Sequence, residues 1–467
     1  DAQVIKTWFV TETFRLEDAA DGTVLLRSAA TGQYAALDAD GTVRVTAERP
    51  EDAESWQREV LRDGRAEAVA AAADADLAIV VLGNHPLIHG RETEDRKGTA
   101  LPPAQDDLLR AVTAVRPQTA LVLMSSYPYA VDWADERLPA VLWTSHGGQE
   151  AGAALADVLL GHAEPGGRLP QTWYRGDDPL PHPLDYDIIK AGWTYQYHRS
   201  PALYPFGHGL SYAAFEYGDL TLSQPATGQD GTVQAALTVR NTGRRAGSEV
   251  LQLYVRALDA RYQAPRLRLA DFRKVRLEPG ESRELVFELP ASALAHWDVA
   301  TGAFTVDPGD YEVIAARSAE HPLAVAPLAV TGTPAAPRAV VEQSLAAVDF
   351  DDHTGIAIVD ADKTRGDAVT PADPAAGAVL SYRALDLTGA ARIEAGIARE
   401  DTDGTARLVV EAGGRVLADI DVPATGDRYT WTTAAAPLTH RPDGIHELRL
   451  HLHGAFRLGD LRFGRTD

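Results

Sequence analysis

The stretch PAVLWTSHGGQEAGAALADVLLGHAEPGGRLPQTWY spans Pro139–Tyr174 and predicts a strand at 140–143, a glycine-rich turn and a helix from about 149 to 160. Glycines in the turns allow such a helix to begin and end tightly. Upstream, the apolar run Leu77–Leu82 predicts a buried strand, and a further strand is predicted at 120–125. These segments therefore predict at least three strands of one sheet.

Helices are predicted between these strands. An alanine-rich amphipathic segment at 66–73 precedes the first strand, and a helix that starts after Pro102-Pro103 and runs to about Val115 precedes the second. Because strands that alternate with helices form parallel sheets, we predict an α/β domain over 63–212. Its proline- and aromatic-rich end, 176–212, predicts an extended segment lying on this domain. Functional groups of such sheets lie on loops at the carboxyl ends of strands, where the loop after Leu82 is placed.

That loop, GNHPLIHGRETEDRKGTALP (Gly83–Pro102), is dense in charge. Its ionisable side chains are His85, His89, Arg91, Glu92, Glu94, Asp95, Arg96 and Lys97. Cleavage of a glycosidic bond requires a carboxylic acid that protonates the leaving oxygen and a second carboxylate of opposite role. The loop can supply the first of these groups, although composition alone favours a solvated charged loop.

The loop resembles the acid/base loop of glycoside hydrolase family 3, in which a Glu lies three residues before an Asp-Arg pair and a Leu-Pro dipeptide follows. Alignment on Asp95-Arg96 and Leu101-Pro102 places that Glu at Glu92. The sequence here is ETEDR, without the Gly that commonly follows the Glu, so Glu94 remains the alternate. Pro139–Tyr174 resembles the strand–helix–GRLP stretch of the family, and YPFGHGLSY (Tyr204–Tyr212) resembles the end of its α/β domain.

This resemblance implies a retaining, exo-acting β-glycosidase of the β-glucosidase or β-xylosidase type, acting at non-reducing ends of O-glycosides without a cofactor. Glu92 is then the acid/base, and His85 and Arg91 are candidate substrate-binding residues. Arg91 and Arg96 should point away from Glu92, because a nearby cation would oppose the raised pKa that a general acid needs. Glu150, His146 and His208, which lie in the matching stretches, are predicted to be structural.

The resemblance also implies an Asp nucleophile on a (β/α)8 barrel. Nothing before residue 63 predicts eight βα units, so we expect the barrel on a separate or removed polypeptide that acts as a partner. The alternative is a non-catalytic carbohydrate-binding or scaffold subunit. The sequence does not choose among sugar specificities, and it leaves compartment and homo-oligomer formation open.

Residues 1–62 predict short strands separated by turns. The segment LRSAATGQYAALDADGTVRV (Leu26–Val45) resembles one repeat of a fascin-like β-trefoil. A trefoil needs three such repeats, and there is room here for little more than one. We therefore predict a partial β-trefoil at this end.

Residues 213–333 predict a β-sandwich, because short alternating strands are separated by turns. The strands are expected at 233–239, 250–255, 285–289 and 311–315. The segments VRNTGRRAGSEVLQLYV, LADFRKVRLEPGES and VDPGDYEV resemble the fibronectin type III-like domain that follows in the same family. No chemistry is expected from it, and Trp297 and Tyr311 are predicted to be core residues.

After a linker at 334–338, residues 339–467 predict a second, jelly-roll-like β-sandwich with strands near 391–398, 406–411, 416–422 and 446–453. RVLADIDVPATGDRYTW (Arg415–Trp431) and GIHELRLHLHG (Gly444–Gly454) resemble a family 6-type carbohydrate-binding module. Tyr429 and Trp431, two residues apart on one strand face, are candidates for stacking on a sugar, with core packing as the alternative. Such modules often carry a structural calcium, for which Glu342 and Asp460 are the candidate ligands.

Composition excludes several other functions. The net charge of −23 argues against nucleic acid and anionic membrane surfaces as partners, since both require a basic face. No run of about 18 apolar residues predicts a transmembrane helix. The absence of cysteine rules out disulfides, thiolate catalysis and cysteine-ligated zinc.

Overall fold

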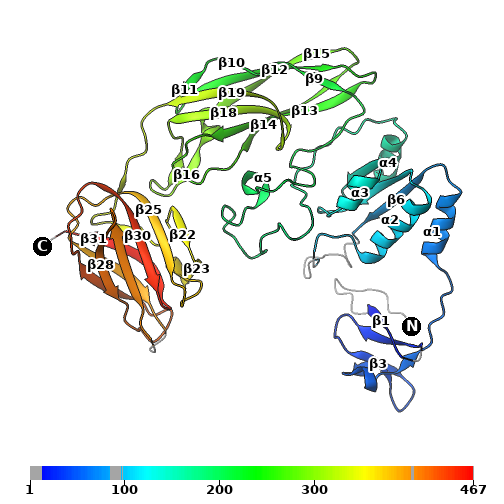
Figure 1. The fold of residues 1–467 in the computed structure, drawn as a ribbon, viewed down its shortest axis with the longest axis horizontal. Coiled ribbons are helices and arrows are strands. Elements are labelled where there is room, and N and C mark those ends of the chain that lie inside the picture. The colour runs from blue at the N-terminus through cyan, green and yellow to red at the C-terminus, as the bar shows by residue number, and fades with distance from the viewer. Residues whose placement is uncertain (1–12, 21, 85–95, 97, 401–403, 466–467) are drawn as a thin grey trace.

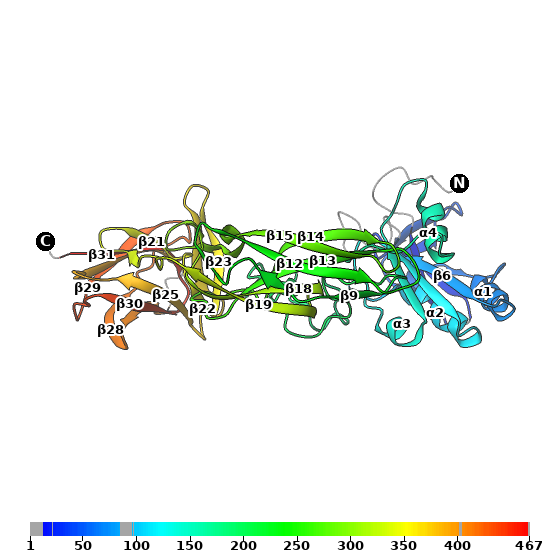
Figure 2. The same ribbon diagram turned by 90° about the horizontal axis from the view of Figure 1, so that it is seen from above.

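The computed structural model describes residues 13–20, 22–84, 96, 98–400 and 404–465. An amino-terminal sheet, an α/β layer and two β-sandwiches follow one another along the chain (Figure 1). In the perpendicular view the α/β layer and the two sandwiches follow one another along the long axis, and the amino-terminal sheet overlaps the α/β layer (Figure 2). In the described part of the chain, each helix is too short or too polar to cross a membrane.

The amino-terminal unit is one antiparallel sheet in the order β1-β2-β3-β4, with β5 pairing to β2. Its elements are β1 (Phe14–Asp18), β2 (Val24–Ser28), β3 (Tyr34–Leu37), β4 (Val43–Ala47), η1 (Pro50–Asp52) and β5 (Ser55–Trp56). Tight turns containing Gly22, Gly32 and Gly41, all at positive φ, connect successive strands. The partial trefoil is not confirmed, because the described strands form a single sheet.

The α/β layer contains a parallel sheet in the order β6-β7-β8, as predicted. Its elements are α1 (Gly64–Ala73), β6 (Ala78–Gly83), α2 (Pro103–Val115), β7 (Thr119–Met124), α3 (Asp132–Arg137), β8 (Ala140–Thr144) and α4 (Ala151–Leu159). Alternate residues of β6 and β7, such as Val80, Leu82 and Leu121, pack with Leu109 of α2 in one core.

The prediction that 77–82 is a buried strand is wrong for one of its faces. Val80 and Leu82 are buried, whereas Ile79 and Val81 on the opposite face are 46% and 52% exposed. In the described residues, no element covers these two side chains. Helix α4 is also apolar, yet none of its residues is buried. This face is unusual, because parallel sheets are normally covered on both sides.

The two stretches that resemble the family, Pro139–Tyr174 and Tyr204–Tyr212, pair with each other beside this sheet. The backbone of Leu169 hydrogen-bonds to His208, and that of Trp173 to Tyr204. The buried Trp173 ring meets Trp143 of β8 edge-on at 6.0 Å between centroids. The segment from 176 to 212 contains one short helix, α5 (Thr194–Tyr197), and otherwise lacks regular structure.

The first sandwich contains the strands predicted from alternation. One sheet has β9 (Phe215–Tyr217), β10 (Thr221–Leu222), β12 (Thr232–Asn241) and β15 (Ser282–Pro290). The other has β11 (Ala226–Gly228), β13 (Gly247–Ala257), β14 (Arg268–Leu277), β18 (Gly309–Ser318) and β19 (His321–Thr331). A short helix, η2 (Ala291–Leu294), precedes a separate hairpin of β16 (His296–Asp298) and β17 (Ala303–Thr305).

The two aromatic residues predicted to lie in the core of this sandwich, Trp297 and Tyr311, differ in burial. Tyr311 is buried, as predicted, and its hydroxyl donates to the carbonyl of Asp307 at 2.8 Å. The prediction for Trp297 is wrong, since this side chain is 55% exposed. The reason is that Trp297 belongs to the separate β16–β17 hairpin and points away from the sandwich core.

The second sandwich has two six-stranded sheets. One contains β20 (Arg338–Ala339), β22 (Asp352–Thr354), β25 (Ala378–Asp386), β27 (Arg407–Ala412), β28 (Arg415–Asp421) and β30 (Ile445–His453). The other contains β21 (Ser344–Ala346), β23 (Ile356–Asp362), β24 (Gly366–Pro371), β26 (Arg392–Ala398), β29 (Thr432–Pro437) and β31 (Arg457–Gly464). Leu380, Ile393, Leu408 and Leu461, from both sheets, are fully buried in the core between them.

A small polar junction connects this second sandwich to the rest of the chain. His353 Nε2 lies 2.8 Å from Asp187 Oδ2, and Lys190 Nζ lies 2.7 Å from Asp352 Oδ1. Gln263 of the first sandwich also donates to Asp352 at 3.2 Å. The junction thus joins the 176–212 segment, the first sandwich and β22.

We expect this junction to loosen in acid. Burial raises the pKa of Asp352, but hydrogen bonds from Lys190 and from the His353 N–H outweigh it and lower the pKa below its usual value. A carboxyl with a lowered folded pKa stabilises the contact above its unfolded pKa, and this contribution is lost as pH falls through the folded pKa. Fluorophores placed on either side of the junction should separate below about pH 4. A transition of the same size and midpoint in Asp352→Asn would contradict this.

Candidate functional site

The predicted catalytic and substrate-binding residues of the acidic loop, namely His85, Arg91, Glu92 and Glu94, lie outside the described residues. The structure describes what flanks them: Gly83 and Asn84 on one side, and Arg96 and residues from Gly98 onward on the other. The first flank lies at the carboxyl end of β6, and Arg96 of the second contacts Tyr127 and Pro128 in the loop after β7. Parallel sheets carry their functional groups at this edge.

The first flank is fixed by side chains from neighbouring elements. Gln105 of α2 accepts from the Gly83 N–H at 3.0 Å and donates to the Gly83 carbonyl at 2.8 Å. Gly83 has φ 149°, and a Cβ there would lie 1.8 Å from the Met124 carbonyl oxygen, so a larger residue does not fit. Asn84 is buried, and its Oδ1 accepts from the Ser126 N–H at 3.1 Å.

The second flank is fixed in a similar way. The Arg96 guanidinium lies 4.0 Å from the centroid of the Tyr127 ring and donates to the Pro128 carbonyl. Asp177 accepts from the Thr99 N–H at 2.7 Å and from its hydroxyl, and these bonds lower the pKa of Asp177. A Cβ on Gly98 would lie 2.4 Å from Asp177 Oδ2. The described residues on both sides of the acidic segment are therefore well anchored.

Two of the three residues predicted to be structural, His146 and His208, have local side-chain contacts, and Glu150 differs from them. His146 Nε2 lies 3.1 Å from Asn84 Oδ1, so it supports the first flank. The His208 ring stacks on Tyr204 at 5.1 Å, and burial lowers the pKa of His208. Glu150 is exposed at the residue before α4 and forms no side-chain cap.

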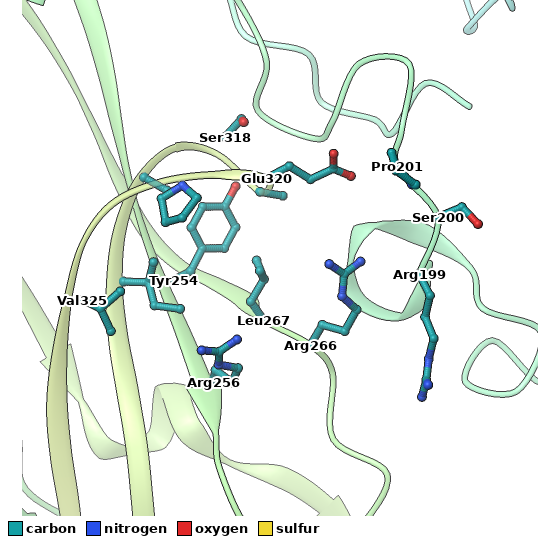
Figure 3. Close-up of a pocket in the computed structure, with 14 residues that line it drawn as sticks. Arg199, Ser200, Pro201, Tyr254, Arg256, Arg266, Leu267, Ser318, Glu320 and Val325 are labelled. Atoms are coloured by element: carbon teal, nitrogen blue, oxygen red, sulfur yellow. The ribbon is translucent and has the colours of Figure 1, made fainter. Parts of the chain in front are cut away.

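One hollow in the described structure lies between residues 199–201 and the first sandwich (Figure 3). It has a volume of about 340 Å³, an apolar floor that includes Tyr254 and Leu267, and an arginine-rich rim. Glu320 is the one carboxylate among the described residues that line it, and its Oε1 accepts from the Ala202 N–H at 3.3 Å.

The two aromatic candidates of the second sandwich lie just before β29 rather than on a strand face, so that part of the prediction is wrong. Tyr429 is 41% exposed, and the Arg457 guanidinium lies 4.9 Å from its ring centroid. Trp431 is half-buried, and its ring lies close against Gly459. Tyr429 therefore has the accessibility that sugar stacking needs, whereas Trp431 is largely used in packing.

The calcium candidates do not form an oxygen cage. The carboxylate of Glu342 accepts from Arg462 at 3.0 Å and from the Arg465 N–H at 2.8 Å, while Asp460 accepts from Ser344 at 3.0 Å. Within the described ranges, no three Asp, Glu or His side chains converge as a metal site would require. With an arginine already paired to Glu342, this donor set does not fit calcium.

Comparison with known protein families agrees with this architecture. Residues 5–212 match the model of the glycosyl hydrolase family 3 C-terminal domain. Residues 249–319 match a fibronectin type III-like domain, and 346–465 match a family 6 carbohydrate binding module. The chain therefore carries these three modules in this order, and the resemblance inferred from the sequence is confirmed.

Individual relatives are β-glucosidases. The chain is 35% identical over 260 residues to a periplasmic β-glucosidase of Salmonella typhimurium, covering 53% of this chain and 33% of that enzyme. It is 36% identical over 271 residues to a β-glucosidase of Rhizobium radiobacter, covering 55% and 33%. The chain thus spans about a third of the length of these curated relatives.

Solved structures give the same picture. A β-glucosidase from Kluyveromyces marxianus in complex with glucose matches with a TM-score of 0.54 and 29% identity, over 60% of this chain and 35% of that one. A family 3 β-glucosidase from Bifidobacterium adolescentis matches with a TM-score of 0.54 and 30% identity, over 59% and 43%.

Proposed function

We propose that this chain supplies the acid/base carboxylate of a retaining, exo-acting β-glycosidase, and that a (β/α)8 barrel outside these 467 residues supplies the Asp nucleophile. The observation that carries the proposal is the acidic segment between two anchored flanks at the carboxyl end of β6, within a domain that matches glycosyl hydrolase family 3. The β-glucosidase names of the relatives support this substrate class.

In the proposed reaction, the barrel Asp attacks the anomeric carbon as its bond to the leaving oxygen breaks, and Glu92 transfers its proton to that oxygen. Glu92, now a carboxylate, then takes a proton from water, whose oxygen attacks the anomeric carbon and displaces the Asp. The two carboxyl groups should lie about 5–5.5 Å apart. Stacking of the Arg96 guanidinium on Tyr127 supports a role in anchoring the flank.

The uncovered face of β6 supports the existence of a partner polypeptide or segment. Ile79 and Val81 on the strand, together with Leu160 after α4, expose apolar side chains that a parallel sheet normally buries. The partner that fits is one that lays an apolar surface against this face. The matched region makes up about a third of each relative, so the relatives contain further chain that could provide such a surface.

A charge on this face should prevent assembly. We expect Ile79→Asp to weaken association with the barrel-bearing polypeptide at least tenfold, because the carboxylate would be buried without a partner. Ile358→Asp is the matched control, since Ile358 is an exposed strand isoleucine, 58% accessible, on the second sandwich. Analytical ultracentrifugation of the mixed polypeptides measures the effect. Equal association of the two variants would show that β6 is not the contact.

The alternative function is a non-catalytic carbohydrate-binding subunit, which the family 6 module match and the exposed Tyr429 favour. The test is to purify the natural particle, map its peptides and assay nitrophenyl β-glucosides, xylosides and arabinosides. A barrel-bearing polypeptide with hydrolysis of one of these substrates supports the proposal. A particle without a barrel that binds sugar but cleaves none of them would replace the proposal with the alternative.

A further inference from the structure

The β16–β17 hairpin of the first sandwich presents two aromatic rings to solvent. Trp297 and Phe304 lie directly opposite each other on the two strands. Their side chains are 55% and 74% exposed, and the rings meet at 80° with centroids 5.4 Å apart. The two rings therefore form an exposed, right-angled apolar corner on this hairpin.

The hairpin beneath these rings is firmly fixed. Arg261 lies between Asp298 and Asp307, at 3.1 Å and 2.8 Å, and the Asp298 side chain is only 3% exposed. His296, the residue before Trp297, stacks face to face on Tyr262 with ring centroids 3.7 Å apart. These contacts hold the strand that carries Trp297 while contributing nothing to cover its ring.

The turn of the hairpin is equally well defined. Asp298 accepts from the Ala300 N–H at 3.1 Å and from the Thr301 hydroxyl at 3.3 Å. Gly302 completes the turn at a φ of 62°, a conformation that glycine adopts without strain. An ion pair between Arg261 and the buried Asp298 carboxylate, together with a capped turn, thus holds two exposed aromatic side chains in place. Such preorganisation reduces the entropy lost when a ligand binds.

We propose that Trp297 and Phe304 form a carbohydrate-binding surface that stacks on the apolar face of a pyranose ring in a β-linked oligosaccharide. Exposed apolar patches commonly mark ligand or interaction sites, and an aromatic ring face complements the C–H face of a sugar. Arg261, with 42% of its side chain exposed, and the exposed Thr301 offer polar groups beside the rings for sugar hydroxyls.

The size of the patch favours a sugar over a protein. Two rings cover about the area of one or two hexose units, whereas a stable protein interface buries about 800 Å² on each partner. The site also lies on the side of the sandwich that faces the family 6 module, where Arg383 donates to the Arg261 carbonyl (Figure 1).

The inference goes beyond the proposed hydrolysis and does not require it, because it concerns binding by this chain without the barrel. Calorimetric titration with cellotetraose and xylotetraose tests it on the full chain. All variants are made in a Tyr429→Ala background, so that the other exposed aromatic candidate does not contribute. Phe272→Ala is the matched control, since Phe272 is an exposed strand aromatic, 56% accessible, on β14 of the same sandwich.

We expect one of the two tetrasaccharides to bind to the Tyr429→Ala chain, and Trp297→Ala to weaken this binding about tenfold or more. Phe272→Ala should leave the affinity unchanged, and Trp297→Phe should retain part of it. Unchanged affinity in Trp297→Ala, or binding of neither sugar to Tyr429→Ala, would overturn the proposal. Hydroxyl-radical footprinting gives a second test. If the barrel-bearing polypeptide, without any sugar, protects Trp297 from oxidation, the surface is a protein contact and the proposal is overturned.

Discussion

Replacing Glu92 by Gln should lower kcat/KM for alkyl β-glucosides by a factor of about 10² to 10⁴, because the amide cannot protonate the leaving oxygen. Nitrophenyl glucosides should lose less, since nitrophenolate leaves with little help from an acid. A larger loss of kcat/KM for the alkyl glucoside than for the nitrophenyl glucoside identifies a missing acid. A misfolded site would lower both values to a similar extent. Glu94→Gln is the matched control and should stay within a few-fold of wild type.

The assembled enzyme with its barrel is the sample for this comparison, assayed with methyl and 4-nitrophenyl β-glucosides. If Glu94→Gln shows the leaving-group dependence and Glu92→Gln does not, the acid/base lies two residues further along. If neither variant shows it, the acidic segment does not supply the general acid.

The second large effect concerns the ion pair between the α/β unit and the first sandwich. Arg168 donates to Glu249 at 2.9 Å, with side chains only 9% and 4% exposed. Glu249 also accepts from the Tyr217 hydroxyl at 3.0 Å, and burial, reinforced by this carboxylate, raises the pKa of Tyr217. Arg168→Met should therefore destabilise this sandwich by about 3–5 kcal/mol, because it leaves a buried carboxylate without its counter-charge.

Scanning calorimetry measures this loss as a fall in the melting temperature of the sandwich. Arg283→Met, which removes an exposed ion pair with Glu281 in the same sandwich, is the control and should cost less than about 1 kcal/mol. Adding Glu249→Gln to Arg168→Met should restore part of the stability, since the buried charge is then absent. Equal effects of Arg168→Met and Arg283→Met would mean that the buried pair contributes little.

The regular elements were largely predictable, because their patterns are local. The strands expected at 233–239 and 446–453 lie within β12 and β30, and the three strands of the α/β layer are parallel as predicted. Helix α3 was missed, since six residues are too few to show helical periodicity. Burial was harder to predict, because periodicity indicates which residues share a face but not whether another element covers that face. Ile79 and Trp297 are the two examples.

The anchors of the candidate site were not predictable. Gln105 reaches Gly83 across 22 residues, and Asp177 reaches Thr99 across 78. Neither residue stands out in the sequence, because an isolated Gln or Asp is normally a solvated surface residue. A glycine directly after a buried strand was the one available signal, and Gly83 is required there by the Met124 carbonyl. Motif resemblance could thus suggest Glu92, but not what fixes the flanks of its loop.

The most direct test of the central claim is the anomeric configuration of the glycosyl azide that Glu92→Gln forms from a nitrophenyl β-glucoside. In a retaining enzyme without its acid/base, azide attacks the covalent intermediate on the face that the leaving group vacated. Proton NMR should therefore show β-glucosyl azide, with turnover that rises as azide is added. Formation of α-glucosyl azide, or no azide product and no rescue, would contradict the assignment of Glu92 as the acid/base of a retaining β-glycosidase.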